Sequence, residues 1–144
     1  MANGHYSMNP VIPNLWIGEE PPSGAGIGEY FDVLVLASRE IQDARRYPKV
    51  KRIMKVPIED NGHPPTSEEI GLAIVAGFDV ANLLSQGKMV LCTCHLGKNR
   101  SSLVAALALR NLGWSAGRAI RAIRQARGND ALGNEWFEEI IRSY

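Results

Sequence analysis

The chain has 144 residues, 45% of them apolar, and a formal net charge of +1. This length suits one domain with a substantial core, and the balanced charge gives no electrostatic reason to expect nucleic acid or a membrane as partner. No apolar run is long enough to span a membrane, and residues 1–9 lack the apolar stretch of a signal peptide. We therefore expect a cytoplasmic protein with an N-terminal tail at 1–9 and a single domain at 10–144.

Apolar runs bounded by turn residues predict four strands, in chain order at 15–17, 31–36, 52–56 and 89–93. A helix is predicted between the last two, because Thr66 and Glu69 have capping-box spacing and apolar residues then follow a helical period until Gly87.

Three further helices are predicted after the last strand. They cover 101–112, which is apolar nearly all round, then Ser115 to Arg127, and finally a stretch opened by Asn134 that buries Phe137. Strands that alternate with helices predict an α/β fold, with a central, mainly parallel sheet of four to five strands flanked by helices on both faces.

The most informative segment runs from Cys94 to Ser101, between the last predicted strand and an apolar helix. In such a tight loop the backbone N–H groups converge at the positive end of the helix, which suits a bound oxyanion and favours a thiolate at Cys94. The predicted phosphate-binding residues are His95, Leu96, Gly97, Lys98, Asn99 and Arg100. Phosphate, sulfate or vanadate should bind in this loop.

Cys94 to Ser101 resembles the Cys-x5-Arg-Ser/Thr signature of cysteine-dependent phosphatases, most closely the small dual-specificity subgroup. Residues 12–18 resemble that family's first strand, and residues 56–60 resemble its acid-bearing turn. The last two helices of the family usually have similar residues at the positions of Ser115, Ala119, Ile123, Arg127, Asn134 and Phe137. The resemblance covers roughly residues 10 to 141 and implies a dual-specificity phosphatase fold.

The residues offer the three functions that phosphate ester hydrolysis requires. Cys94 is the candidate nucleophile, and Arg100 can hold two phosphate oxygens with its planar guanidinium. Asp60, just beyond a strand end and followed by the Gly- and Pro-rich 61–65, is the candidate general acid, with Glu59 and His63 as rivals. The resemblance implies that the hydroxyl of Ser101 bonds the cysteine sulfur. Neither a metal nor another cofactor is expected.

The resemblance implies a phosphorylated protein as substrate, with phosphotyrosine and also phosphoserine or phosphothreonine hydrolysed, and we expect a monomer. Two other enzymes stay open: Gly97-Lys98 resembles phosphoinositide phosphatases, and Gly97-x-Asn99-Arg100 resembles RNA 5′-triphosphatases. A phosphate-binding module without turnover is a further alternative. Lys98 is either a second cation at the rim of the loop or a solvated side chain.

Thr93 departs from the family pattern, which has histidine immediately before the cysteine. We therefore expect Cys94 to ionise at higher pH than in members with histidine, and the hydroxyl of Thr93 to bond a loop carbonyl. Cys92, two residues back on a strand, should point the same way as Cys94 and either packs in the core or serves as a redox partner. A metal site from Cys92, Cys94 and His95 is disfavoured, because adjacent positions point apart and no fourth ligand is evident.

Overall fold

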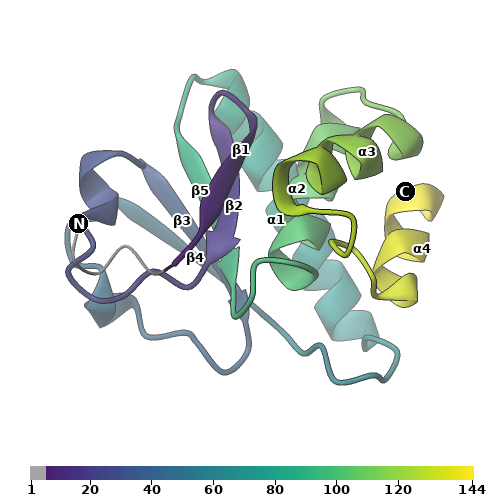
Figure 1. The fold of residues 1–144 in the computed structure, drawn as a ribbon, viewed down its shortest axis with the longest axis horizontal. Coiled ribbons are helices and arrows are strands. Elements are labelled where there is room, and N and C mark those ends of the chain that lie inside the picture. Colours follow the sequence, from purple (N-terminus) through teal and green to yellow (C-terminus); the bar gives the residue numbers. More distant parts are fainter. Residues whose placement is uncertain (1–5) are drawn as a thin grey trace.

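The computed structural model describes residues 6–144 and contains one five-stranded sheet (Figure 1). The strands are β1 (Met8–Ile12), β2 (Leu15–Glu19), β3 (Val33–Ser38), β4 (Arg52–Ile58) and β5 (Val90–Cys94), in the spatial order β1-β2-β5-β3-β4. β1 pairs antiparallel with β2, and all other pairings are parallel. β5 is therefore the central strand, with parallel neighbours on both sides.

The helices are α1 (Ser67–Ser85), α2 (Arg100–Asn111), α3 (Ala116–Arg127) and α4 (Glu135–Ser143), with short 3-10 helices η1 (Ile27–Glu29) and η2 (Ala44–Arg46). The capping box of Thr66 and Glu69 at α1 is confirmed, and the side chains of Ser115 and Asn134 accept hydrogen bonds at the starts of α3 and α4. None of the helices in the described part of the chain combines the length and hydrophobicity needed to cross a membrane.

The four predicted strands are confirmed, and each of their ends differs from the prediction by at most two residues. β1 was not predicted. Its residues are only partly buried, and it contains Pro10 beside a register shift, so it lacks the apolar run of a buried strand. β1 begins at Met8, so it includes the last two residues of the tail predicted at 1–9, and residues 1–5 of that tail lie outside the described residues.

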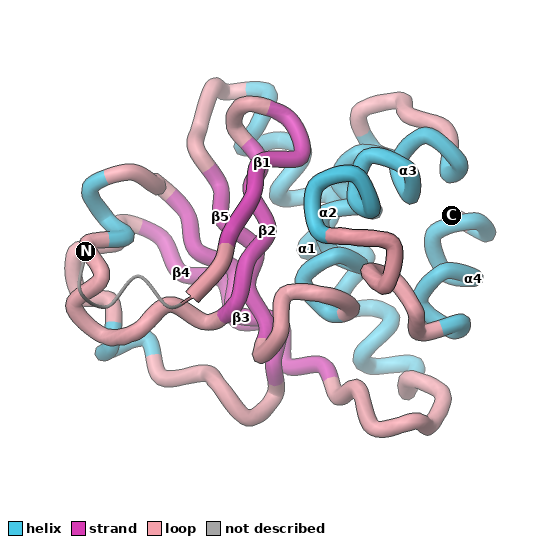
Figure 2. Tube along the Cα trace, viewed as in Figure 1, coloured by secondary structure: helices cyan, strands magenta, loops and turns pink. Residues whose placement is uncertain are grey.

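The two faces of the sheet are covered unequally (Figure 2). All four α-helices pack on the face presented by Val33, Val35 and Cys92, where they form the larger core. The opposite face, presented by Leu34 and Leu91, is covered by loops and η1. The predicted α/β class is confirmed. The prediction of helices on both faces is corrected, because all four α-helices pack on one face and the other is covered by η1 and loops.

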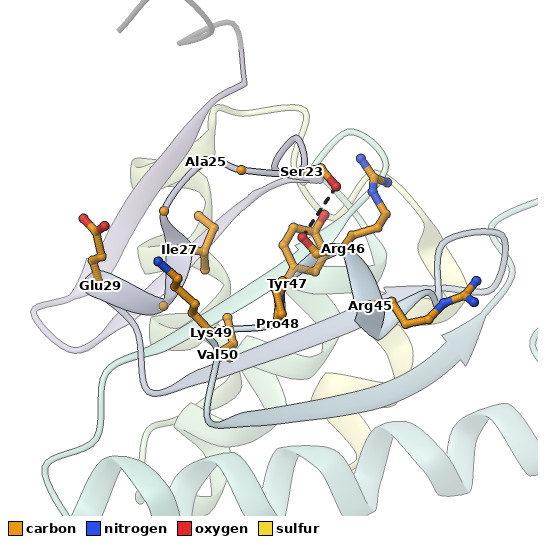
Figure 3. A pocket seen from close by; sticks show the side chains of 13 residues that line it. Ser23, Ala25, Ile27, Glu29, Arg45, Arg46, Tyr47, Pro48, Lys49 and Val50 are labelled. Carbon is orange, nitrogen blue, oxygen red and sulfur yellow. Dashed lines mark hydrogen bonds between the residues drawn. The ribbon is translucent and has the colours of Figure 1, made fainter.

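The loop side of the sheet holds a cavity of about 420 Å³ between residues 23–29 and 45–50 (Figure 3). Its wall includes Ile27, Tyr47 and Val50, which belong to the smaller core. None of the predicted site residues lines it, so the Pro- and Gly-rich loop of residues 21–26 contributes to this cavity rather than to the predicted site.

Candidate active site

The segment between β5 and α2 forms a tight loop at the carboxyl end of the central strand. Cys94 is the last residue of β5 and Arg100 is the first of α2. Gly97 has a φ of 67°, and a Cβ at this position would lie 2.6 Å from the carbonyl carbon of Gly18. Only glycine fits both the left-handed backbone and the close approach of β2.

Cys94 is 4% exposed, and its Sγ lies 3.2 Å from the Oγ of Ser101 in the first turn of α2. The structure thus places the sulfur and the hydroxyl side by side at the base of the loop. A hydroxyl at this distance can donate to a sulfur anion.

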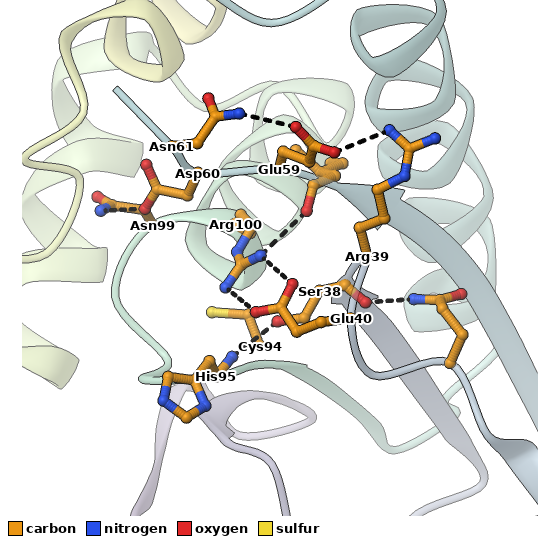
Figure 4. Close-up of polar contacts among 12 residues, drawn as sticks. Ser38, Arg39, Glu40, Glu59, Asp60, Asn61, Cys94, His95, Asn99 and Arg100 are labelled. Carbon is orange, nitrogen blue, oxygen red and sulfur yellow. Dashed lines mark hydrogen bonds and ion pairs between the residues drawn. The ribbon is translucent and has the colours of Figure 1, made fainter. Parts of the chain in front are cut away.

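The loop amides divide into two groups. The N–H of His95 donates to the Oγ of Ser38, at 2.8 Å, so this amide is already occupied. Within residues 6–144, the backbone N–H groups of residues 96 to 100 donate to no protein acceptor. Of the predicted phosphate-binding residues 95 to 100, only 96 to 100 therefore have a backbone N–H without an acceptor among the described residues. The exposed side chain of His95 lies at the edge of this loop (Figure 4).

The Arg100 guanidinium is held in place by Glu40, a residue that sequence reasoning missed (Figure 4). Nη1 and Nη2 donate to the two carboxylate oxygens of Glu40 at 2.8 and 3.0 Å, and Nη1 also donates to the carbonyl of Ile58 at 3.1 Å. Of the five donors of an arginine, the Nε–H and the second Nη2–H have no partner among residues 6–144 and remain for another ligand. These two hydrogens form one edge of the planar group, which is the edge suited to a phosphate.

The hydrogen bond from Arg100 lowers the pKa of Glu40 below its ordinary value, although its own burial acts in the opposite direction. The only available sequence signal for Glu40 was its place after β3, whose carboxyl end must lie beside that of β5 in a parallel sheet.

Asp60 lies beside the loop, and its carboxylate accepts two side-chain hydrogen bonds. Nδ2 of Asn99 donates to Oδ2 at 2.8 Å, and Nδ2 of Asn134 donates to Oδ1 at 2.9 Å. Cavities of about 350 and 310 Å³ lie on the two sides of Asp60, the first walled in part by Trp136 and the second by Arg100. Asp60 therefore lines both openings, next to the residues of the loop.

The rival acids are placed differently. Glu59 forms an ion pair with Arg39 at 3.2 Å, and its backbone N–H donates to Glu69. His63 is exposed, and its side chain donates and accepts no hydrogen bond within the described residues. Of these three candidates, Asp60 is the one that contacts the loop between β5 and α2 directly, through Asn99.

The loop is braced from α3. Arg127 is buried and donates from Nε to the carbonyl of Gly97 at 3.0 Å and from Nη2 to that of Leu96 at 3.1 Å. Lys98 donates to the backbone carbonyl of Arg127 and forms an ion pair with Asp130 at 3.0 Å. Lys98 is thus neither the free rim cation nor the solvated side chain considered from the sequence.

The two residues before Cys94 have structural environments. The Thr93 hydroxyl donates to the carbonyl of Val35 at 2.8 Å, so its partner is a residue of β3 rather than of the loop. Cys92 is fully buried in the same core as Cys94, which confirms that the two side chains share a face of β5. Burial raises the pKa of the Cys92 thiol, which favours its interpretation as a core residue.

Solved structures with a similar fold include dual-specificity and tyrosine phosphatases. A mouse putative dual specificity phosphatase, complexed with zinc tungstate, is 25% identical, with a TM-score of 0.79 and coverage of 95% of this chain and 85% of that chain. Human DUSP28 is 23% identical, with a TM-score of 0.79 and coverage of 95% and 91%. PTPMT1 in complex with PI(5)P is 16% identical, with a TM-score of 0.69 and coverage of 94% and 95%.

These likenesses define the chain as a dual-specificity-phosphatase-like α/β protein, and they confirm the resemblance predicted from its sequence. No protein-family model matches the chain, and comparison with curated protein sequences finds no match.

Proposed function

We propose that the protein is a phosphatase that hydrolyses phosphate monoesters on proteins through a cysteinyl-phosphate intermediate. One observation carries the proposal. The Sγ of Cys94 lies 3.2 Å from the Oγ of Ser101, at the base of a loop whose amides at 96 to 100 have no acceptor within residues 6–144, and Arg100 opens the helix that follows. This combination serves a sulfur nucleophile and a tetrahedral dianion together.

In the first step the Cys94 thiolate attacks phosphorus. The S–P bond forms as the bond from phosphorus to the ester oxygen breaks, and protonated Asp60 gives its proton to the leaving alcohol or phenol. The loop amides and the free edge of Arg100 bind the three equatorial oxygens, where they neutralise the charge of the transition state.

In the second step a water molecule attacks the cysteinyl phosphate. Asp60, now a carboxylate, takes a proton from this water as the new O–P bond forms. The S–P bond breaks, and Sγ leaves as a thiolate that accepts a hydrogen bond from the Ser101 hydroxyl. Inorganic phosphate departs, and the enzyme returns to its starting protonation state.

Phosphotyrosine is the proposed main substrate, with phosphoserine and phosphothreonine also accepted. The alternative of a phosphoinositide rested on Gly97-Lys98, and the PI(5)P of the PTPMT1 structure belongs to the same class of ligand. The ammonium of Lys98 is engaged by Asp130 and by the Arg127 carbonyl, so it does not add a free positive charge for further phosphate groups. This contact supports the phosphopeptide over the polyphosphorylated substrates.

The test is hydrolysis of an aryl phosphate by the wild-type protein and by Cys94→Ser, with and without chelator. We expect turnover by the wild type in both conditions and none by the variant. The matched control is Cys92→Ala, which removes a thiol from the same strand and should retain activity. Turnover by Cys94→Ser would refute the nucleophile.

The substrate class is tested separately on phosphotyrosine, phosphoserine and phosphothreonine peptides, PI(5)P and triphosphate-ended RNA. The proposal expects the highest kcat/KM on a phosphotyrosine peptide. A higher value on the lipid or the RNA would replace the proposed substrate with that one, and binding of phosphopeptide without turnover would define a module instead.

A further inference from the structure

The side chain of Asn99 has no role in starting the helix that it precedes. Asn99 occupies the N-cap position of α2, yet its side chain accepts no capping hydrogen bond. Its amide instead bridges two other parts of the site: Nδ2 donates to Asp60 at 2.8 Å, and Oδ1 accepts the backbone N–H of Asn134 at 3.2 Å. The residue next to Arg100 therefore connects the loop to the candidate acid and to the start of α4.

The segment that bears Asp60 is also attached at both ends. Glu69 accepts the backbone N–H of Glu59 on Oε2 at 2.7 Å and that of Thr66 on Oε1 at 2.9 Å. Residues 61–65 are rich in glycine and proline, but the ends of the segment are anchored to α1 and Asp60 is anchored to the loop.

We propose that Asn99 is a positioning residue that holds Asp60 in register with the phosphate-binding loop. The inference rests on the proposed function, since it gives Asp60 the role of general acid. Because this donor belongs to the loop itself, the Asn99 side chain links the position of the acid directly to that of the bound phosphoryl group. The bond uses only one lone pair of Oδ2, and Asp60 retains others on which the transferred proton can reside.

Asn134 completes the arrangement from α4. Its Nδ2 donates to the other oxygen of Asp60 at 2.9 Å, while its Oδ1 accepts the N–H of Phe137. Removal of the Asn134 side chain would also remove the cap of α4, so this variant would mix positioning with folding. Asn99 caps no helix with its side chain, although its Oδ1 also accepts the backbone N–H of Asn134, so Asn99→Ala disturbs folding less and is the better probe.

The experiment compares Asn99→Ala with the wild type on two substrates, phenyl phosphate with a poor leaving group and 4-nitrophenyl phosphate with an activated one. General acid catalysis is worth about a hundredfold or more, so a misplaced acid should slow phenyl phosphate by at least about tenfold, and the activated ester by much less. Asn99→Asp, which replaces the donor with a charge that repels Asp60, should slow phenyl phosphate further. Asn82→Ala, on the exposed face of α1, is the control and should change neither rate.

Coupling to Asp60 separates positioning from a general disturbance of the loop. In an Asp60→Ala background, Asn99→Ala should have no further effect on either substrate, because the residue through which it acts is gone. Equal slowing of both substrates by Asn99→Ala, or an additive loss in the double variant, would overturn the proposal, as would an unchanged rate.

Failure of the proposed function would look different. In that case the wild type would not hydrolyse either aryl phosphate, or Cys94→Ser would remain active. An active wild type that depends on Cys94 and Asp60, with no response to Asn99→Ala, would refute the role of Asn99 alone.

Discussion

Gly97→Ala is the substitution whose effect the structure specifies most closely. The φ of 67° places this residue in the left-handed region, which costs an alanine about 1 kcal/mol. The new Cβ would also lie 2.6 Å from the carbonyl carbon of Gly18, 2.8 Å from its oxygen and 2.8 Å from Nη2 of Arg127. The backbone of β2 cannot yield as a flexible side chain would, and overpacking of this kind costs about 1–3 kcal/mol.

The expected loss in the free energy of unfolding is therefore about 3 kcal/mol. Urea denaturation followed by fluorescence or circular dichroism measures it. Because the loop must shift to relieve the contact, the amides and Arg100 move relative to Cys94, and displacements on the order of 1 Å cost about a hundredfold in rate. Aryl phosphate turnover should fall by about that factor.

Gly87→Ala is the matched control. Gly87 follows α1 with a φ of 80°, and a Cβ there would meet no atom within 4 Å. This variant should lose only the backbone contribution of about 1 kcal/mol and keep its activity. Equal destabilisation by the two substitutions would show that the contact with β2 is unimportant, and unchanged turnover in Gly97→Ala would refute the link between this contact and the loop.

Three further outcomes are expected. Arg127→Lys should lower the free energy of unfolding by about 2 kcal/mol and turnover by about tenfold, because an ammonium cannot bond both loop carbonyls as a planar guanidinium does. Thermal unfolding and aryl phosphate kinetics measure these two effects. Unaltered kinetics would show that Arg127 does not brace the loop. Glu40→Gln should lower kcat/KM about tenfold by loosening Arg100. Arg100 lowers the pKa of Glu40, so the difference in free energy of unfolding between wild type and Glu40→Gln should be largest above pH 4.5, the ordinary pKa of a glutamate. It should disappear as the pH falls through the lowered pKa. A difference that persisted at lower pH would contradict this. Cys92 should resist iodoacetamide at neutral pH in the folded protein and react in urea, because burial raises its pKa; mass spectrometry that finds two labels per native chain would contradict its burial.

The features predicted from the sequence are those whose physical cause lies within a short segment. The caps at Thr66, Ser115 and Asn134 bond backbone groups three residues away, so their residue types alone indicate where helices begin. The loop from Cys94 to Ser101 is also contiguous, and a strand, a glycine and an apolar helix in that order leave few ways to connect them.

The features that were missed depend on partners far away in the chain. Glu40 is 60 positions from Arg100, and Asn134 is 74 positions from Asp60. β1 gained its place from pairing with β2, since its own residues carry no buried apolar run. No periodicity or spacing encodes such pairs when a single sequence is considered.

The sequence by itself determined the α/β class, the helix starts and the loop that joins a cysteine to an arginine, because local hydrogen bonds and hydrophobic periodicity specify them. Only the tertiary structure decided which edge of Arg100 is free, that Lys98 pairs with Asp130, and that Asn99 contacts Asp60. Those outcomes depend on how parallel strands bring their carboxyl ends together, and that arrangement exists only once the sheet has formed.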